Sequence, residues 1–194
     1  MAYDATRYAL IAAGMRDMLL GGYDSVGIAG VLSRSGVPKV SFYHYFDSKE
    51  SFGRAIVEAY AEKWRATRRA TFSRGDLRPI ERLDAHFLEL EEDVRAQEGM
   101  GGCLLGNLSQ LMASRSVVLR RAIETAFQEW QEDMVGVLEA ARSAGELPSN
   151  ADAEEIAALV IEAYEGALMR AKSQASLVPL ERFRKTTLKR LLGT

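Results

Sequence analysis

The stretch Val37-Pro-Lys-Val-Ser-Phe-Tyr-His-Tyr-Phe-Asp-Ser-Lys-Glu50 concentrates aromatic and hydroxyl side chains between two breaks in the chain. Pro38 suits the first turn of a helix, and Ser48 can cap a new helix directly after it. Phe42 and Phe46 are four residues apart and share one helical face, which we assign to the core. Two turns of helix are unstable alone. The pattern therefore predicts a short helix that its neighbours hold and that shows its polar face to a partner.

The residues before this stretch predict two further helices. Apolar positions from Thr6 to Leu20 recur at helical spacing, and Gly21-Gly22 ends that helix. Ser25 can cap a second, short helix from Val26 to Arg34. Two helices joined by a turn, followed by a short exposed helix, form the helix-turn-helix arrangement.

The rest of the chain repeats the helical pattern, and alternation typical of strands is absent. We expect an all-α protein with about nine helices. Arg65, Arg68, Arg69 and Arg74 form a basic end of the fourth helix, which we expect to be a solvated face. Beyond the first three, the predicted helices are residues 48–72, 80–94, 103–112, 117–144, 152–173 (capped by Asp152) and 179–192.

Composition excludes several classes of protein. The 194 residues contain one cysteine and two widely separated histidines, so we expect neither a disulfide framework nor a metal site, and no cofactor. No apolar run reaches the length of a membrane span, and the first residues lack signal-peptide grammar, which predicts a cytoplasmic protein. Residues 1–75 contain eleven Lys and Arg against seven Asp and Glu, whereas residues 76–194 contain fourteen against twenty. The balances of +4 and −6 indicate a nucleic-acid reader joined to a different module.

Residues 6–52 resemble the DNA-binding domain of the TetR family of bacterial transcription regulators. The matching elements are Arg7, Gly22-Tyr23, Gly36-Val-Pro-Lys-Val-Ser-Phe-Tyr-His-Tyr-Phe46 and Ser48-Lys-Glu50. The resemblance implies a helix-turn-helix domain at 1–50 and an effector-binding and dimerisation domain at 51–194, with helix 48–72 connecting the two. Gly102-Cys-Leu-Leu-Gly-Asn-Leu-Ser109 and the segment 164–172 resemble a subgroup that includes regulators answering to small electrophiles or unsaturated acids.

The resemblance also implies a homodimer whose third helices enter successive major grooves of a palindromic operator. Lys39 can contact guanine or a phosphate, and Lys49 adds its charge to the N–H groups of a helix start. Position 40 is usually glycine in such sequences, so Val40 predicts a different operator. Tyr43 fits a phosphate contact or, alternatively, a packed aromatic. The expected DNA-binding residues are Arg7, Ser25, Lys39, Val40, Ser41, Tyr43, His44, Tyr45 and Lys49.

The effector side offers five candidates. Cys103 opens a helix, where the dipole favours thiolate and so reaction with an electrophile or oxidant. A buried cysteine that acts as a small hydrophobe is the alternative. Asn107 lies one turn further among leucines, where an inward amide needs a partner. The other candidates are His86, between Leu83 and Leu90, and Trp130 and Tyr164, for which a plain core position is the alternative.

We expect a DNA-binding transcriptional regulator, in particular a repressor that a small molecule, an electrophile or a redox signal releases from its operator. The alternative is a helical small-molecule-binding protein or enzyme that does not bind DNA. The sequence offers no nucleophile–histidine arrangement, no credible carboxylate pair and no phosphate-binding glycine loop, so we expect no enzymatic activity.

Overall fold

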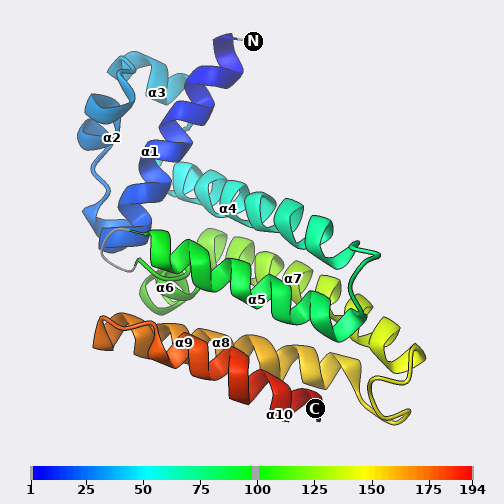
Figure 1. The fold of residues 1–194 in the computed structure, drawn as a ribbon. Helices are drawn as coiled ribbons and strands as arrows, with labels where there is room; N and C mark the ends of the chain where they lie inside the picture. The colour runs from blue at the N-terminus through cyan, green and yellow to red at the C-terminus, as the bar shows by residue number, and fades with distance from the viewer. Residues whose placement is uncertain (1, 98–100, 194) are drawn as a thin grey trace. The chain divides into compact units, whose positions relative to one another are not determined.

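The computed structural model describes residues 2–97 and 101–193, without the side chains of residues 2–4 and of Val40. Within these ranges the regular elements are all helices (Figure 1). Nine helices result when the three contiguous segments at the C-terminus are counted as one. The predicted all-α class is confirmed.

The chain divides into two compact units. The first unit is Met1–Lys63 with Cys103–Ala126, and the second unit is Trp64–Gly102 with Phe127–Thr194. Two long helices contribute residues to both units: α4 (Lys49–Phe72) and α7 (Val117–Ser143). The division at residue 50 stays a prediction about function, because packing groups residues 103–126 with the N-terminal helices.

The first unit packs around three phenylalanines. The ring of Phe42 lies 5.4 Å from that of Phe46 and 5.1 Å from that of Phe52, and the latter two are 4.8 Å apart. All three are buried, as predicted for Phe42 and Phe46. Gly14 permits this packing, because a Cβ there would lie 2.5 Å from the Phe52 ring. The unit's other helices are α1 (Ala2–Ser25), α2 (Ile28–Ser35), α3 (Lys39–Tyr45) and α6 (Leu104–Met112).

Helix ends in the first unit follow the predictions only in part. Ser48 caps α4, since its hydroxyl accepts from the Ser51 N–H at 3.0 Å, and the Ser51 hydroxyl accepts from the Ser48 N–H at 3.1 Å. Gly22 breaks α1, with φ 75° and ψ 178°. The predicted cap at Ser25 is wrong: α2 begins after Gly27, and the Ser25 hydroxyl instead donates to the carbonyl of Gly22 at 2.8 Å.

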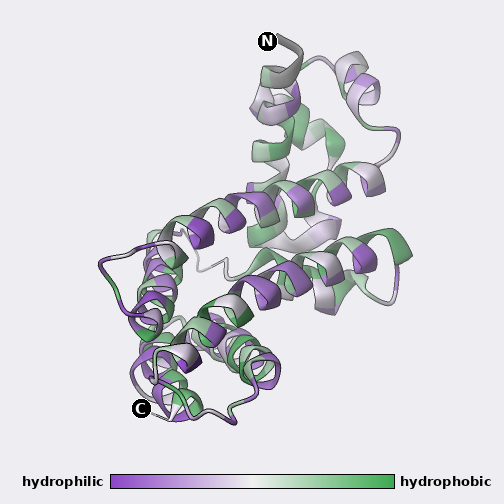
Figure 2. Cartoon of the chain, turned by 90° about the vertical axis from the view of Figure 1, so that its right-hand side faces the viewer, coloured by the Kyte–Doolittle hydropathy of each residue, from purple (hydrophilic) through white to green (hydrophobic). Residues whose placement is uncertain are grey.

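The second unit is built from long amphipathic helices, and Figure 2 shows hydrophobic and hydrophilic residues recurring along each of them. Asp152 caps α8 as predicted, accepting from the N–H groups of Glu154 and Glu155. The last helix changes its winding to a π-helix in its middle. The elements are the remainder of α4 and α7, α5 (Pro79–Ala96), α8 (Ala153–Gln174), α9 (Val178–Arg182), the π-helix η1 (Phe183–Leu188) and α10 (Lys189–Leu192).

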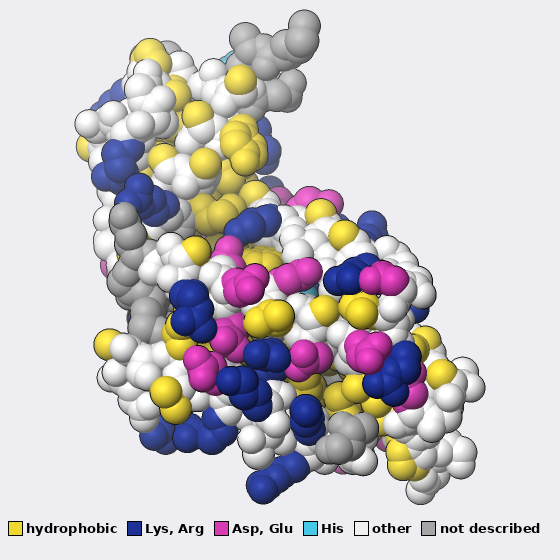
Figure 3. All heavy atoms as spheres, in the orientation of Figure 1, with side chains coloured by type: hydrophobic (Ala, Val, Ile, Leu, Met, Phe, Trp, Pro, Cys, Tyr) yellow, Lys and Arg dark blue, Asp and Glu magenta, His cyan; other side chains and the backbone are white. Residues whose placement is uncertain are grey.

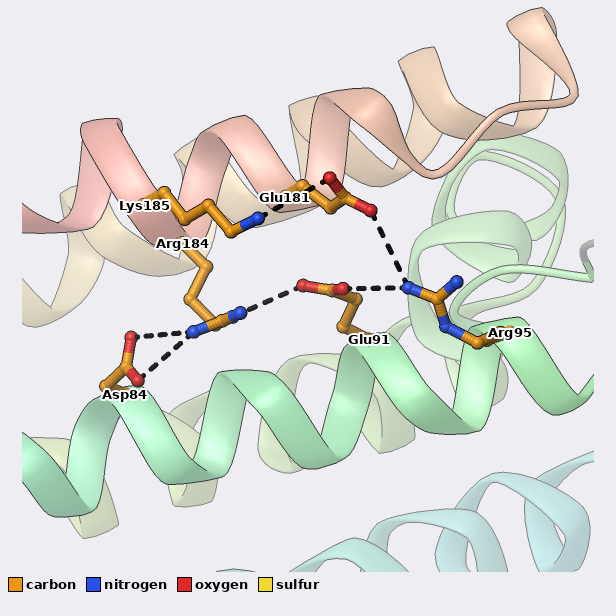
Figure 4. A network of polar contacts seen from close by, with 6 residues as sticks. All are labelled: Asp84, Glu91, Arg95, Glu181, Arg184 and Lys185. Carbon is orange, nitrogen blue, oxygen red and sulfur yellow. Dashed lines mark hydrogen bonds and ion pairs between the residues drawn. The ribbon is translucent and has the colours of Figure 1, made fainter.

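Charged side chains of both signs intermingle over α5 and the C-terminal helix (Figure 3). Arg184 of η1 contacts Glu91, with Nε 3.2 Å from the carboxylate, and Asp84, with Nη1 3.2 Å away (Figure 4). Arg95 forms ion pairs with both Glu91 and Glu181. Since the Glu91 side chain is only 6% exposed, these ion pairs satisfy a buried carboxylate and fix η1 on α5.

Candidate functional site

Helix α3 presents its polar side chains away from the phenylalanine core. Lys39 and His44 are exposed and Tyr43 is 52% exposed, whereas Ser41 and Tyr45 are half-buried. The side chain of Val40 lies outside the described residues. This side of the short helix therefore offers an ammonium group, hydroxyls and an imidazole at successive turns. Such groups are suited to base edges and phosphates.

The other predicted DNA-contacting residues lie on α1 and at the start of α4, in the same unit as α3. The Lys49 ammonium lies 4.6 Å from the centre of the Tyr23 ring, a cation–π contact at the start of α4. The Arg7 guanidinium lies 5.7 Å from the centre of the Phe46 ring. Ser25 is exposed at the end of α1. Aromatic rings of the core thus hold two of the cations.

The effector candidates fall into two groups. Cys103 and Asn107 belong to the first unit, where Cys103 is the N-cap residue of α6 and only 7% exposed. The Asn107 amide donates to the carbonyl of Leu19 at 3.2 Å, so its predicted need for a partner is met by the last full turn of α1 before Gly22.

His86, Trp130 and Tyr164 come together in the second unit. The His86 and Trp130 rings are 6.0 Å apart, and the Trp130 and Tyr164 rings 5.7 Å apart. His86 is 1% exposed. Burial, reinforced by the charge of Arg68, lowers the pKa of His86 to about 3, so its imidazole is neutral at pH 7.

Arg68 is a buried residue that the sequence did not single out. Its side chain is 5% exposed and its guanidinium pairs with Asp133, with Nη2 2.8 Å from the carboxylate. Arg65 pairs with Glu129 in the same way. The expected solvated basic face is therefore wrong for Arg68, whose spacing of four residues from Trp64 was the available signal.

The described residues contain no cluster of three or more His, Cys, Asp or Glu able to hold a metal ion. None of the helices described is both long and apolar enough to cross a membrane.

Known protein families match both the N-terminal and the C-terminal part of the chain. Residues 10–56 match the family of bacterial regulatory proteins called tetR, and residues 79–187 match the tetracyclin repressor-like C-terminal domain. Over 179 residues the chain is 36% identical to the transcriptional regulator AcuR of Cereibacter sphaeroides, a match that covers 92% of this chain and 81% of that protein.

Solved structures give the same result. The regulatory protein TetR from Rhodobacter sphaeroides superposes with a TM-score of 0.89 at 34% identity, covering 95% of this chain and 97% of that one. The reduced form of Escherichia coli NemR superposes with a TM-score of 0.86 at 28% identity, covering 95% of each chain. These relatives are regulators rather than enzymes. Because one family model covers the helix-turn-helix residues and the other more than half of the chain, the protein belongs to the TetR family and is a DNA-binding transcriptional regulator.

Proposed function

We propose that the protein is a homodimeric repressor that binds a palindromic operator through α3 and is released from it by a small molecule. The observation that carries the DNA-binding mode is the two-sided character of α3. Phe42 and Phe46 anchor one side in the core, while Lys39, Tyr43 and His44 remain exposed on the other. A short helix held in this way can enter a major groove.

The contacts divide by chemistry. Lys39, Val40, Ser41 and His44 of α3 are assigned to base edges, whereas the hydroxyls of Tyr43 and Tyr45 on the same helix are assigned to phosphates. The remaining groups bind phosphates and set the register of the helix, with Lys49 adding its charge to the first turn of α4. These phosphate-binding residues are Arg7, Ser25, Tyr43, Tyr45 and Lys49.

Dimerisation is assigned to α8 and the C-terminal helix. Leu159 and Met169 of α8 are exposed, as is Val178 at the start of α9. Ala163 and Gly166 are small and half-buried, so a second copy can approach closely. Joining two such faces about a twofold axis gives the two half-site readers that a palindrome requires.

We assign the action of the effector to one of two alternative sites. His86, Trp130 and Tyr164 form the site of a reversible ligand in the second unit. Cys103 forms the site of an unsaturated electrophile. The thiol proton of Cys103 leaves to solvent, the sulfur bonds to one alkene carbon as the C=C π bond opens, and the neighbouring carbon takes a proton from solvent. The name of one similar structure, which calls it the reduced form of NemR, supports a redox signal. Either signal lowers operator affinity by favouring a conformation in which the two α3 helices do not fit both half-sites. The change in the equilibrium between the two conformations is set by the difference in effector affinity for them.

Selection of bound sequences from a random duplex pool, with and without N-ethylmaleimide, tests this function. A recovered palindrome that the maleimide releases from wild type but not from Cys103→Ser supports both the repressor and the thiol signal. A palindrome indifferent to the maleimide leaves the reversible ligand as the signal. Failure to enrich any sequence would contradict the proposed operator binding.

A further inference from the structure

His86 and Trp130 are buried polar side chains of the second unit whose ring nitrogens have no hydrogen-bond partner among the described residues. His86 of α5 is 1% exposed and Trp130 of α7 is 6% exposed. Buried polar groups are nearly always paired, and each exception needs an explanation. The two rings meet edge to face with their centroids 6.0 Å apart, so the unpartnered nitrogens belong to neighbouring side chains.

Aromatic rings enclose this location. The Phe72 ring lies 5.2 Å from His86, and the Phe87 ring lies 5.3 Å from Tyr164 and 5.0 Å from Phe183. Phe183 begins the π-helix, and π segments inside α-helices occur frequently at functional sites. The aromatic cage, as we call it, comprises Phe72, His86, Phe87, Trp130, Tyr164 and Phe183.

A cavity of about 300 Å³ adjoins the aromatic cage. Phe72 lines this cavity and its ring also lies 5.2 Å from that of His86, so the cavity reaches the edge of the aromatic cage. Asp133 lines it as well and pairs with the buried Arg68. The volume is at the lower end of small-molecule sites, which are mostly apolar with a few placed polar groups. Rotation of one phenylalanine side chain would join the cavity to the unpartnered nitrogens.

The charges around His86 select against an ionic ligand. His86 is neutral at pH 7 because burial and the charge of Arg68 lower its pKa to about 3. A cationic ligand would meet the repulsion that already acts on His86. An anionic ligand beside His86 would find the guanidinium of Arg68 already bound to Asp133. Arg69 and Arg82 line the adjoining cavity, where Arg69 is exposed to solvent and Arg82 donates to the carbonyls of Phe72 and Leu77. Burial of an uncompensated charge is costly, so a neutral molecule fits best.

We propose that the aromatic cage binds a small, flat, uncharged molecule that carries both a hydrogen-bond donor and a hydrogen-bond acceptor. The Trp130 N–H donates to the acceptor of the ligand. A neutral imidazole has one N–H and one acceptor nitrogen, so His86 satisfies the donor and can support the acceptor. The proposal rests on the effector site proposed above and specifies the chemistry of its ligand.

Three probes of similar size test this chemistry: benzamide, which is neutral with a donor and an acceptor; benzoate, which is charged; and toluene, which is apolar. The Trp64→Phe variant retains Trp130 as its single tryptophan. Benzamide is expected to change Trp130 fluorescence saturably and to bind at least tenfold more tightly than benzoate or toluene. Calorimetry with the wild type repeats the ranking without any substitution.

His86→Phe keeps an aromatic ring but removes both nitrogens, and is expected to abolish the preference for benzamide over toluene. Leu88→Phe, at an exposed position of the same helix as His86, is the control and should leave all three affinities unchanged. Absence of saturable benzamide binding to the wild type, as expected if the nitrogens bind only water, would overturn the proposal. Equal binding of toluene and benzamide would overturn it too.

Operator binding is measured in the same samples. Benzamide that binds the cage without lowering operator affinity supports the ligand chemistry and contradicts the effector role of the site. Loss of operator binding on addition of benzamide in the wild type, but not in His86→Phe, supports both. The proposed ligand chemistry and the proposed effector role can therefore be rejected independently of each other.

Discussion

At the scale of single residues, Gly14 limits how closely α1 and α4 approach within the first unit. A Cβ at this position would lie 2.5 Å from Cζ of Phe52 and 2.7 Å from Cδ1 of Ile56. Gly14→Ala is expected to destabilise the protein by about 1–3 kcal/mol, because the buried ring must move. Gly136→Ala in α7, where no heavy atom lies within 4 Å, should instead stabilise by about 0.5–1 kcal/mol. Urea unfolding of both variants measures the contrast, and equal effects would show that Gly14 is not a packing site.

His86 makes stability depend on pH. Its pKa is about 3 in the folded protein and 6.5 otherwise, so the unfolded state binds more protons between these values. The contribution is complete above pH 6.5 and is lost as pH falls through this window, at up to about 1.4 kcal/mol per pH unit. From pH 6.5 to 5 the wild type is expected to lose about 1.5 kcal/mol that His86→Phe does not lose. A persistent loss in His86→Phe would contradict the assignment.

Lys49 and Tyr43 are proposed to contact phosphates of the operator. Lys49→Ala and Tyr43→Ala should weaken operator binding at a fixed salt concentration without unfolding the protein. If Lys49 neutralises one phosphate in each subunit, its removal should lower the slope of log affinity against log salt by about 2. Lys185→Ala, on the C-terminal helix, is the control. A slope unchanged by Lys49→Ala would remove Lys49 from the interface.

At the scale of elements, the ion pairs between α5 and η1 differ in burial and so in their contribution. Arg184→Ala removes one of two partners from the buried Glu91 carboxylate and is expected to cost about 1–3 kcal/mol. Lys185→Ala breaks an exposed pair with Glu181 and should change stability by no more than about 0.5 kcal/mol. Thermal unfolding of the two variants compares neighbouring positions on one helix. Similar losses would mean that the carboxylate of Glu91 does not depend on Arg184.

Helices were predictable from this sequence, because apolar periodicity and caps such as Ser48 and Asp152 act within a few residues. Ser25 was misassigned because the positive φ of Gly22 directs the chain so that the hydroxyl reaches a carbonyl of the preceding turn. His86 and Trp130 could be named as candidates, but only the packing shows that their nitrogens lack partners among the described residues. The contact of Asn107 with Leu19 joins residues 88 positions apart, and no local pattern encodes it.

At the scale of the whole molecule, the first unit is assembled from two separate lengths of chain. The side chains of Leu104, Leu108 and Leu119 are buried, and α6 packs on α1. A fragment of residues 1–63 would expose the surfaces that these segments cover. It is therefore expected to show no cooperative thermal transition by circular dichroism, whereas the full chain shows one. Cooperative unfolding of the fragment would demonstrate that the helix-turn-helix is stable without α6.

The same discontinuity delays co-translational folding of the first unit. Residue 63 is synthesised before residue 103 exists, and the first unit is complete only when residue 126 has been added. At about 5–20 residues per second, the 63 residues between positions 63 and 126 take about 3–13 s. During that interval the nascent chain carries unburied apolar helix faces, which makes it a client for chaperones. A cell can therefore acquire this DNA reader only after the first segment of the second unit, Trp64–Gly102, has also been translated.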